Sequence, residues 1–455
     1  MINNSNMMSL VKFTLVGVAL LLGSNCTNKE IDPPPADVGF VDQPTVEVIP
    51  FEELLDLVQQ RTFNYFWDFA EPVSGLARET SQDDALGGDG DRVVTTGGSG
   101  FGIACFPAAV ERGWITRAEA IERLNKILNF LESCETYHGV FSHWYIGDTG
   151  QTRDFSPLDN GADLVETAFL LQGLLINRQY LSNTVPEEAV IINRISTIYE
   201  NVEWSWFERG QNEMTWHWSP DNGFAIDLKI QGWNESLMVY VLAAGSPTFP
   251  ITKLTYDNGW ARNGQIINNN TYVGTVLPLG VDFGGPLFYS HYSFIGLDPT
   301  NLSDQYANYF NQNVAHSLIN YEYCKNNPNN YIGYGGDSWG LTASNDYNGY
   351  AVHDPLNDIG VITPTAALSS FPYTPEESRK ALEYFYYNLN DRLWGEYGFY
   401  DAFSEEFNWF DDGYLAIDQG PIVAMIENYR SQMLWNLFMQ DQDVINGLNL
   451  LEFTY

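Results

Sequence analysis

Two helical segments that are apolar on nearly every side constrain the fold of this chain more than any other feature. They are residues 161–181 (GADLVETAFLLQGLLINRQYL) and residues 234–245 (NESLMVYVLAAG). A helix of this kind has to be surrounded by protein, because it has no polar face to turn toward water. Other segments repeat apolar residues every three or four positions along one face, which is typical of half-exposed helices. The two kinds of helix together predict an inner and an outer layer of helices.

Further helices are predicted along the whole chain, whereas alternating strand patterns are scarce. Residues 116–134 open with a capping box formed by Thr116 and Glu119, and a second box is predicted at Thr374. Residues 268–280 are a candidate short hairpin. The fold class that these patterns indicate is all-α, an α/α toroid with long loops. The other predicted helices cover residues 51–69, 187–207, 302–323, 374–389 and 419–438.

The charge balance excludes one class of partner. Lys and Arg number 21 against 58 Asp and Glu, for a formal net charge of −37. Such a chain repels phosphate groups, so we expect no binding to nucleic acid. Aromatic residues make up 15% of the chain, with 13 Trp and 27 Tyr. This content favours either a large aromatic core or flat surfaces that stack on the C–H faces of sugars.

The N-terminal residues have the anatomy of a secretory signal peptide. Lys12 precedes the apolar run FTLVGVALLLG, which is too short to cross a bilayer and is soon followed by Cys26. A cysteine at this place resembles the lipidation site of bacterial lipoproteins. We expect a signal peptide over residues 1–25, a tether over residues 26–49 and a single domain over residues 50–455. The protein would then be exported and anchored by lipid alone on the periplasmic or cell-surface side of a bacterial membrane, as a monomer.

No cofactor or metal ion is expected from the sequence. The three cysteines beyond residue 26 are an odd number without zinc-site spacing. The acidic stretch 83–91 (DDALGGDGD) lacks EF-hand spacing and is interpreted as a solvated loop. His143, His217 and His291 are too dispersed to predict a ligand set. The sequence also lacks a P-loop and a dinucleotide-binding fingerprint.

Three carboxyl groups stand near the start of the first apolar helix. Asp163 and Glu166 are three residues apart and would share a helix face, and no Lys or Arg lies between residues 154 and 177. The helix macrodipole also favours acids at this end, and Asp159 or Asn160 would serve as the N-cap. A carboxyl group held against apolar walls keeps its proton near neutral pH, as an acid catalyst must. We therefore interpret Asp163 and Glu166 as catalytic, with Asp159 as a further candidate.

Glu235 repeats this arrangement at the start of the second apolar helix. Glycoside hydrolysis commonly uses two carboxyl groups that flank the scissile bond, and the starts of inner helices would meet at one mouth of a toroid. Tryptophans that lie among polar or glycine-rich neighbours are candidate platforms for sugars. They are Trp144, Trp216, Trp218, Trp233 and Trp339.

Several segments resemble, in the same order, the bacterial glucoamylase-like proteins that include the β-1,2-glucanases of glycoside hydrolase family 144. They are VTTGGSGFGIACFPAAVERGWITRAEA, GVFSHWYIGDTG, DNGADLVETAFLLQGLL, MTWHWSPDNGF, GWNESLMVYVLA and AIDQGPIVAMIENYRS, within roughly residues 50 to 440. The resemblance implies an (α/α)6 toroid, a neutral glucan or oligosaccharide as substrate and inversion at the anomeric carbon. It also implies that Asp159, Asp163 and Glu166 match the acidic cluster of the family, and that Glu235 matches its further acid. We expect Glu235 or Glu166 to act as the acid, and Asp163 to position or activate water.

Other functions remain open from the sequence. An α-glucan hydrolase of the glucoamylase type would use the same fold and two acids. A glycan-binding surface lipoprotein would need the aromatic platforms without paired acids. A polysaccharide lyase would act on anionic sugars, for which this acidic chain is a poor host. Endo action and exo action on a β-1,2-glucan are not distinguished by the residues.

Overall fold

Half-exposed and buried helices alternate along the computed structural model, which describes residues 48–455. The predicted signal peptide, Cys26 and nearly all of the predicted tether lie outside the described residues. Residues 48–455 form one compact unit. The half-exposed helices are α1 (Phe51–Trp67), α4 (Arg117–Leu131), α6 (Pro186–Glu200), α9 (Lys253–Asn258), α10 (Tyr309–Asn326) and α12 (Pro375–Glu383). The buried segments that follow them in turn are α2 (Thr96–Ala104), α5 (Leu164–Tyr180), α8 (Leu237–Gly245), two 3-10 turns (Leu287–Ser290 and Ser293–Ile295), α11 (Pro364–Leu368) and α13 (Ala416–Ser431).

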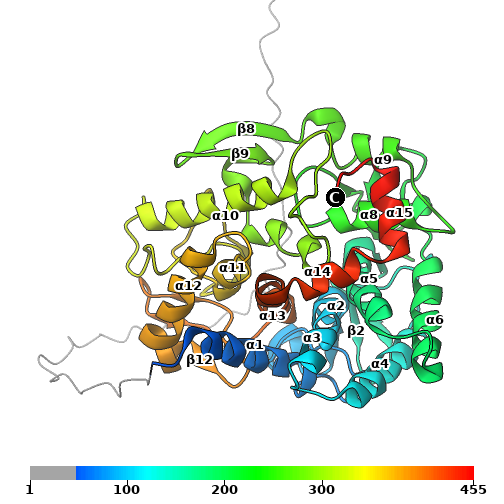
Figure 1. Ribbon diagram of the computed structural model, residues 1–455, viewed down its shortest axis with the longest axis horizontal. Helices are drawn as coiled ribbons and strands as arrows, with labels where there is room; N and C mark the ends of the chain where they lie inside the picture. The colour runs from blue at the N-terminus through cyan, green and yellow to red at the C-terminus, as the bar shows by residue number, and fades with distance from the viewer. Residues whose placement is uncertain (1–47) are drawn as a thin grey trace, which may run out of the picture. The chain divides into compact units, whose positions relative to one another are not determined.

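The buried segments close into an inner ring, with the half-exposed helices outside it (Figure 1). Helix α2 packs against α5 and α13, α5 packs against α8, and α11 packs against α13. The two 3-10 turns complete the ring, because Met238 N–H donates to Ser293 Oγ at 3.0 Å and His291 Nε2 lies 3.0 Å from Ser370 Oγ. The predicted toroid of two helical layers is confirmed, and its fourth inner element is a pair of short turns rather than a regular helix.

Helix α2 was not predicted, because its sequence TGGSGFGIA is rich in glycine, which disfavours helices in isolation. Every residue of α2 is buried. A Cβ atom on Gly100 would lie 2.2 Å from the carbonyl oxygen of Phe169 in α5. The glycines therefore let two inner helices approach at backbone distance, and this packing outweighs their low helix propensity.

The predicted helix starts are partly confirmed. Thr116 caps α4 in a complete capping box with Glu119, which typically contributes about 1 kcal/mol. Thr374 is the N-cap of α12, but its hydroxyl makes no capping bond and instead contacts the carbonyl of Ser370. The second predicted box is therefore wrong. Helix α10 begins at Tyr309, later than the predicted residue 302, because Asn308 supplies the cap.

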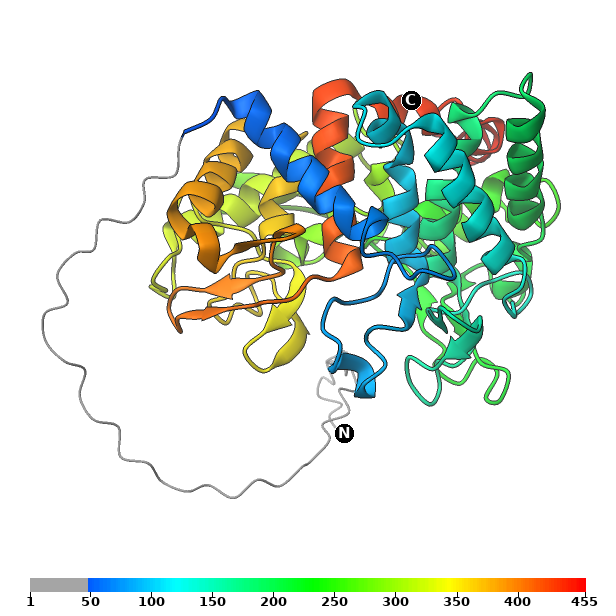
Figure 2. The same cartoon turned by 90° about the horizontal axis from the view of Figure 1, so that it is seen from below.

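Short antiparallel strands lie in the connections between the helices, and many of the loops gather in the lower part of Figure 2. Strands β8 and β9 lie at the outer edge beside α10 (Figure 1). The predicted hairpin over 268–280 is confirmed as β8 and β9. The strands are β1 (Val93–Thr95), β2 (Trp144–Ile146), β3 (Gln151–Arg153), β4 (Ala162–Asp163), β5 (Met214–Thr215), β6 (His217–Trp218), β7 (Lys229–Ile230), β8 (Ile267–Tyr272), β9 (Thr275–Leu279), β10 (Ala343–Asp346), β11 (Gly349–Val352), β12 (Trp394–Gly395), β13 (Gly398–Phe399), β14 (Phe403–Ser404) and β15 (Trp409–Phe410). Strands β1, β2 and β3 form a three-stranded sheet, and the others pair two by two.

The remaining helices fill the outside of the ring. They are α3 (Phe106–Glu111), α7 (Trp204–Phe207), α14 (Met433–Phe438) and α15 (Gln442–Leu450). Between residues 48 and 455, no helix combines the length and apolar character needed to cross a membrane. In the same part of the chain Cys105, Cys134 and Cys324 are unpaired thiols, and Cys105 and Cys324 are buried.

Candidate active site

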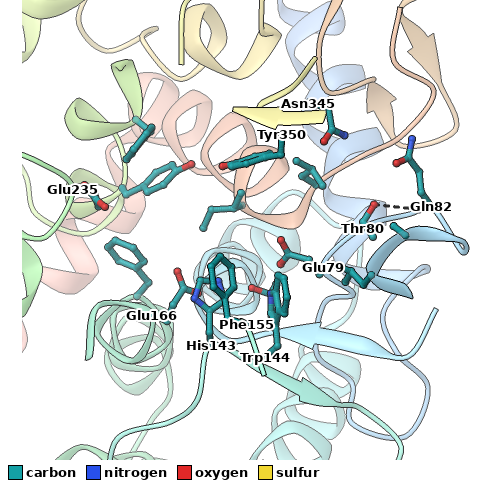
Figure 3. A pocket seen from close by; sticks show the side chains of 18 of the residues that line it. Glu79, Thr80, Gln82, His143, Trp144, Phe155, Glu166, Glu235, Asn345 and Tyr350 are labelled. Carbon is teal, nitrogen blue, oxygen red and sulfur yellow. Dashed lines mark hydrogen bonds between the residues drawn. The ribbon is translucent and has the colours of Figure 1, made fainter. Parts of the chain in front are cut away.

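A cavity of about 440 Å³ opens where the inner helices begin. Thr95, Glu166, Glu235 and Ile417 lie on its wall, next to or within the first turns of α2, α5, α8 and α13. Figure 3 shows carboxyl groups from different parts of the chain facing one space. The other lining residues are Glu79, Thr80, Gln82, Ala85, Leu86, His143, Trp144, Phe155, Phe169, Trp216, Phe288, Tyr292, Asn345, Tyr350 and Leu415.

Asp163 is the N-cap of α5, a role that the sequence had suggested for Asp159 or Asn160. Its Oδ1 accepts hydrogen bonds from the backbone of Val165 at 3.1 Å and of Glu166 at 3.0 Å, and from the indole of Trp216 at 2.8 Å. The side chain is 1% exposed and is not part of the cavity wall. Asp163 therefore stands outside the helix, and the expected shared face with Glu166 is corrected. Its hydrogen bonds stabilise the start of α5.

Two histidines lie beside Asp163, around which the sequence has no Lys or Arg. His143 Nδ1 lies 3.0 Å from Asp163 Oδ2, and His217 Nε2 lies 3.5 Å from the same oxygen and 3.4 Å from Asp159 Oδ2. Burial would raise the pKa of Asp163, but hydrogen bonds and charge from the two histidines hold it well below its usual range. Burial would lower the pKa of His143, but the charges of Glu166, Asp163 and Asp159 raise it to about 10.

Asp159 is buried beside His217 and does not reach the cavity wall. Burial raises the pKa of Asp159, while His217 opposes the change. Because the ligand atoms of His143, Asp159 and Asp163 lie within 4.8 Å of one another, they are the group among residues 48–455 that could hold a metal ion. In the structure His143 is already paired with Asp163, and His217 lies beside Asp159 and Asp163.

Glu166 lies on the cavity wall and contacts α2. Its Oε2 accepts a hydrogen bond of 2.7 Å from Gly97 N–H, and a Cβ atom at Gly97 would lie 2.4 Å from this oxygen. Burial, together with repulsion from Asp163, raises the pKa of Glu166 to about 7, although His143 and the Gly97 bond oppose the change. The glycine is therefore required for the place that Glu166 takes.

Glu235 faces the cavity from the segment just before α8. Ser293 fixes the backbone here, because its hydroxyl donates to the carbonyl of Glu235 and accepts from Met238 N–H. Among residues 48–455, the half-buried carboxyl group is contacted by its own backbone N–H and by no hydrogen bond from another residue. Burial, with repulsion from Glu166 and Asp163, raises the pKa of Glu235 to about 7. The sequence predicted both cavity acids of the inner helices, Glu166 and Glu235.

The five predicted tryptophans separate into two groups. Trp144 and Trp216 line the cavity. Trp218 packs instead against Trp206, Trp233 is 4% exposed and packs behind the wall, and Trp339 is fully buried with its indole bonded to the carbonyl of Glu377. Trp233 and Trp339 are enclosed by the helices and cannot serve as sugar platforms, so the expectation is corrected for these two residues. Trp218 is half-buried and lies off the cavity wall, and its contact with sugar stays a prediction.

Several residues of the cavity wall were not predicted from the sequence. Phe155 is 49% exposed and packs against Trp144, with ring centres 4.8 Å apart. Tyr350 and Asn345 come from the hairpin of β10 and β11, and Glu79 comes from the loop before β1. No sequence pattern marks these residues, although the wall of the cavity brings them beside the predicted acids. The acidic loop 83–91 lies partly against basic side chains, since Asp89 pairs with Arg92 and Arg153.

The sequence matches one family model and one curated relative. The model of the family Glycoamylase, described as "Putative glucoamylase", matches residues 227–442. An exo β-1,2-glucooligosaccharide sophorohydrolase (non-reducing end) of Parabacteroides distasonis is 45% identical over 423 residues, which are 88% of this chain. The chain spans 58% of the length of that relative.

Solved structures show the same architecture. An endo-β-1,2-glucanase from Chitinophaga pinensis, in complex with sophorotriose and glucose, is 48% identical and superposes with a TM-score of 0.88. The match covers 90% of this chain and 99% of that one. An endo-β-1,2-glucanase from Talaromyces funiculosus in complex with sophorose is 11% identical with a TM-score of 0.61, and covers 88% of both chains. At this identity the second likeness concerns the fold alone.

Proposed function

The chain belongs to the glucoamylase-like family that includes bacterial β-1,2-glucanases, and from this premise we propose that it is a glycoside hydrolase that cleaves β-1,2-glucan or sophoro-oligosaccharides. The observation that carries the proposal is the pair of cavity acids. Glu235 and Glu166 face one cavity, and the pKa of each is raised to about 7. An acid with such a pKa retains much of its proton near neutral pH and can give it to a leaving oxygen.

Glu235 is the proposed general acid. Among the described residues, no side chain or backbone group of another residue hydrogen-bonds to its carboxyl group, so its proton is available to a substrate in the cavity. Glu166 also lies on the cavity wall, and one of its oxygens accepts a hydrogen bond from Gly97 N–H. Its role is a polar contact for the sugar. Asp163 and Asp159 act indirectly, because they hold the start of α5 and the histidines in place and neither lies on the wall.

The cavity wall suits a neutral sugar. Its described lining residues include no Lys or Arg, and its histidine, His143, is already paired with Asp163, so an anionic sugar would find no free counter-charge among them. Trp144, Trp216, Phe155 and Tyr350 supply aromatic surface, on which the C–H faces of glucose residues can pack. This arrangement argues against a uronate-directed lyase. It is compatible with a glucan whose hydroxyl groups bond to the acids.

Product analysis on a panel of glucans tests the proposal. Linear β-1,2-glucan, sophoro-oligosaccharides and starch are incubated with the protein, and proton NMR follows the anomeric form of the first products. We expect sophorose or longer sophoro-oligosaccharides, released as the α-anomer, and no products from starch. Products from starch alone would contradict the proposed linkage, and saturable binding of β-1,2-glucan without products would indicate a binding protein. The sizes of the products distinguish endo action from exo action.

We also propose that the protein is an exported monomeric lipoprotein anchored at Cys26. Support comes from the apolar run before this cysteine, which lies outside the described residues. Metabolic labelling with a palmitate analogue in a bacterial host, with Cys26→Ala as the control, tests the anchor. Label on the wild-type protein and none on the variant is the expected result, whereas equal labelling would contradict it. Light scattering of the domain tests the monomer.

A further inference from the structure

The proposed hydrolysis also needs a group that takes a proton from the attacking water, and the predicted candidate does not suit this task. Asp163 is already engaged by three N–H donors and two histidines, and it lies behind the cavity wall. Asp159 also lies off the wall. Glu166 has a raised pKa and one oxygen bonded to Gly97 N–H. A further carboxyl group on the wall is therefore of interest.

Glu79 is a cavity carboxyl group whose backbone is fixed between two inner helices. Its N–H donates to the carbonyl of Val93 at 3.0 Å, and its carbonyl accepts from Ala416 N–H at 3.0 Å. These contacts tie it to β1, which leads into α2, and to the first residue of α13. Its side chain lines the cavity, and Oε2 is buried without a hydrogen-bond partner from residues 48–455. Burying such an oxygen unpaired costs free energy, which a role in contacting water or substrate would explain.

Glu79 and Glu235 lie on different sides of the cavity. Figure 3 shows Glu235 at one side, Glu79 toward the other, and Glu166 between them. The charge of Glu79 contributes to the raised pKa of Glu166 but is not among the causes of the raised pKa of Glu235, which agrees with a larger separation from Glu235. Inverting glycosidases place their acid and base about 6.5 to 9.5 Å apart, so that a water molecule fits beside the sugar.

Two more acids lie near Glu79 but cannot take its place. Burial, with repulsion from Asp411, raises the pKa of Asp401 to about 8. Burial, with repulsion from Asp401, raises the pKa of Asp418 well above its usual range. Both side chains are at most 2% exposed, and neither lies on the wall. They therefore do not reach a water molecule in the cavity.

The neighbouring basic residue, Arg78, does not pair with Glu79. The guanidinium group of the neighbouring Arg78 points elsewhere, where it donates to the backbone carbonyls of Asp91 and Phe69. The titratable groups whose pKa values respond to the charge of Glu79 are Tyr65 in α1, Glu166 in α5, Tyr350 in β11, Asp401 before β14 and Asp418 in α13. Glu79 thus lines the cavity, has acids and tyrosines around it, and has one buried oxygen without a hydrogen-bond partner among residues 48–455.

We propose that Glu79 is the general base of the reaction, an inference that rests on the proposed function. Its carboxylate takes one proton from the attacking water while the water oxygen bonds to the anomeric carbon. The bond from that carbon to the glycosidic oxygen breaks, and the leaving oxygen takes the proton of Glu235. Attack from the face opposite to the leaving group inverts the configuration. Glu79 then returns its proton to solvent and Glu235 takes one up, so the enzyme is restored.

The experiment compares Glu79→Gln with Glu235→Gln on two substrates. On linear β-1,2-glucan we expect both variants to lose about 10²–10⁴-fold in kcat. On the β-fluoride of a sophoro-oligosaccharide the two should differ, because fluoride leaves without a proton. Glu235→Gln should keep most of its activity on the fluoride, whereas Glu79→Gln should remain inactive. Added azide should restore Glu79→Gln by direct attack and give an α-glycosyl azide.

Controls separate this role from a structural one. Glu187→Gln changes an exposed side chain and should keep wild-type activity. Thermal unfolding and calorimetric binding of sophoro-oligosaccharide test whether Glu79→Gln is folded and binds. Glu79→Asp keeps the carboxyl group and should retain partial activity. This variant provides the test if Glu79→Gln does not fold. A wild-type enzyme with no activity on any glucan overturns the proposed function and this inference with it. An active wild type with an equally active Glu79→Gln, or a Glu79→Gln that hydrolyses the fluoride normally, overturns only the assignment of Glu79.

Discussion

Replacing Glu235 with Gln should remove activity and at the same time stabilise the fold in a pH-dependent manner. The carboxyl group lies at an aromatic and acidic cavity wall without a hydrogen bond from another described residue, and its pKa is raised from 4.5 to about 7, mainly by burial. A group whose pKa is higher in the folded state favours folding only while it is protonated. Stability is therefore lost as the pH rises from about 4.5 to about 7, and the loss is complete above that window.

The size of the effect follows from the change in pKa. At about 1.36 kcal/mol per pH unit, the ionised form of Glu235 costs the folded state roughly 3 kcal/mol. Gln is neutral at every pH, so Glu235→Gln should raise the free energy of unfolding by about this amount at pH 8 and by close to zero at pH 4. A domain of this size has an unfolding entropy of about 0.9 kcal/mol/K. The expected increase in Tm at pH 8 is therefore about 3 to 4 °C.

Differential scanning calorimetry at pH 4 and pH 8 measures this difference, with Glu187→Gln as the exposed control. The kcat/KM of the wild type on β-1,2-glucan should fall as the pH rises through about 7, because Glu235 then loses the proton that it donates. The variant should show little activity at any pH. An equal change in Tm at both pH values, or a lower Tm of the variant at pH 8, would refute the reasoning.

Three further substitutions test the geometry of the site. Gly97→Ala would place a Cβ atom 2.4 Å from Glu166 Oε2, so we expect kcat to fall at least about 10-fold as the carboxyl group is displaced, measured with glucan. Trp216→Phe removes the 2.8 Å hydrogen bond to Asp163 and should lower the free energy of unfolding by about 1.5–3 kcal/mol, measured by urea denaturation; an unchanged midpoint would contradict the stabilising role of Asp163. Phe155→Ala removes exposed aromatic surface from the wall and should raise KM several-fold with little change in kcat, and an unaltered KM would exclude Phe155 from binding.

Parts of the fold that depend on local patterns were predictable. The apolar segments became α5 and α8, and the capping box of Thr116 and Glu119 formed as expected. Helix α2 was not predictable, because its glycines disfavour a helix until α5 is packed against it. The same limit applies to the inner 3-10 turns, whose place is set by contacts such as that between Ser293 and Met238.

The residues of the candidate site also separate into those that the sequence predicted and those that it did not. Glu166 and Glu235 were predicted because an acid in an otherwise apolar helix start is conspicuous, and Trp144 and Trp216 do lie on the wall. Trp233 is enclosed instead, since Trp260, Phe294 and Tyr309 pack around it. Glu79 left no signal in the sequence, because nothing in its neighbourhood along the chain distinguishes it from the other acids.

By itself, the sequence determined the helical layers and the acids at the helix starts, because hydrophobic periodicity and capping act over a few residues. It also determined the strong negative charge. Only the tertiary structure decided which acids face the cavity. The histidines that pair with Asp163 come from β6 and from the residue before β2, far from it along the chain. The pKa of a carboxyl group depends on burial and on charges within a few ångströms. Those neighbours are set when the ring closes, and no local pattern in the chain encodes them.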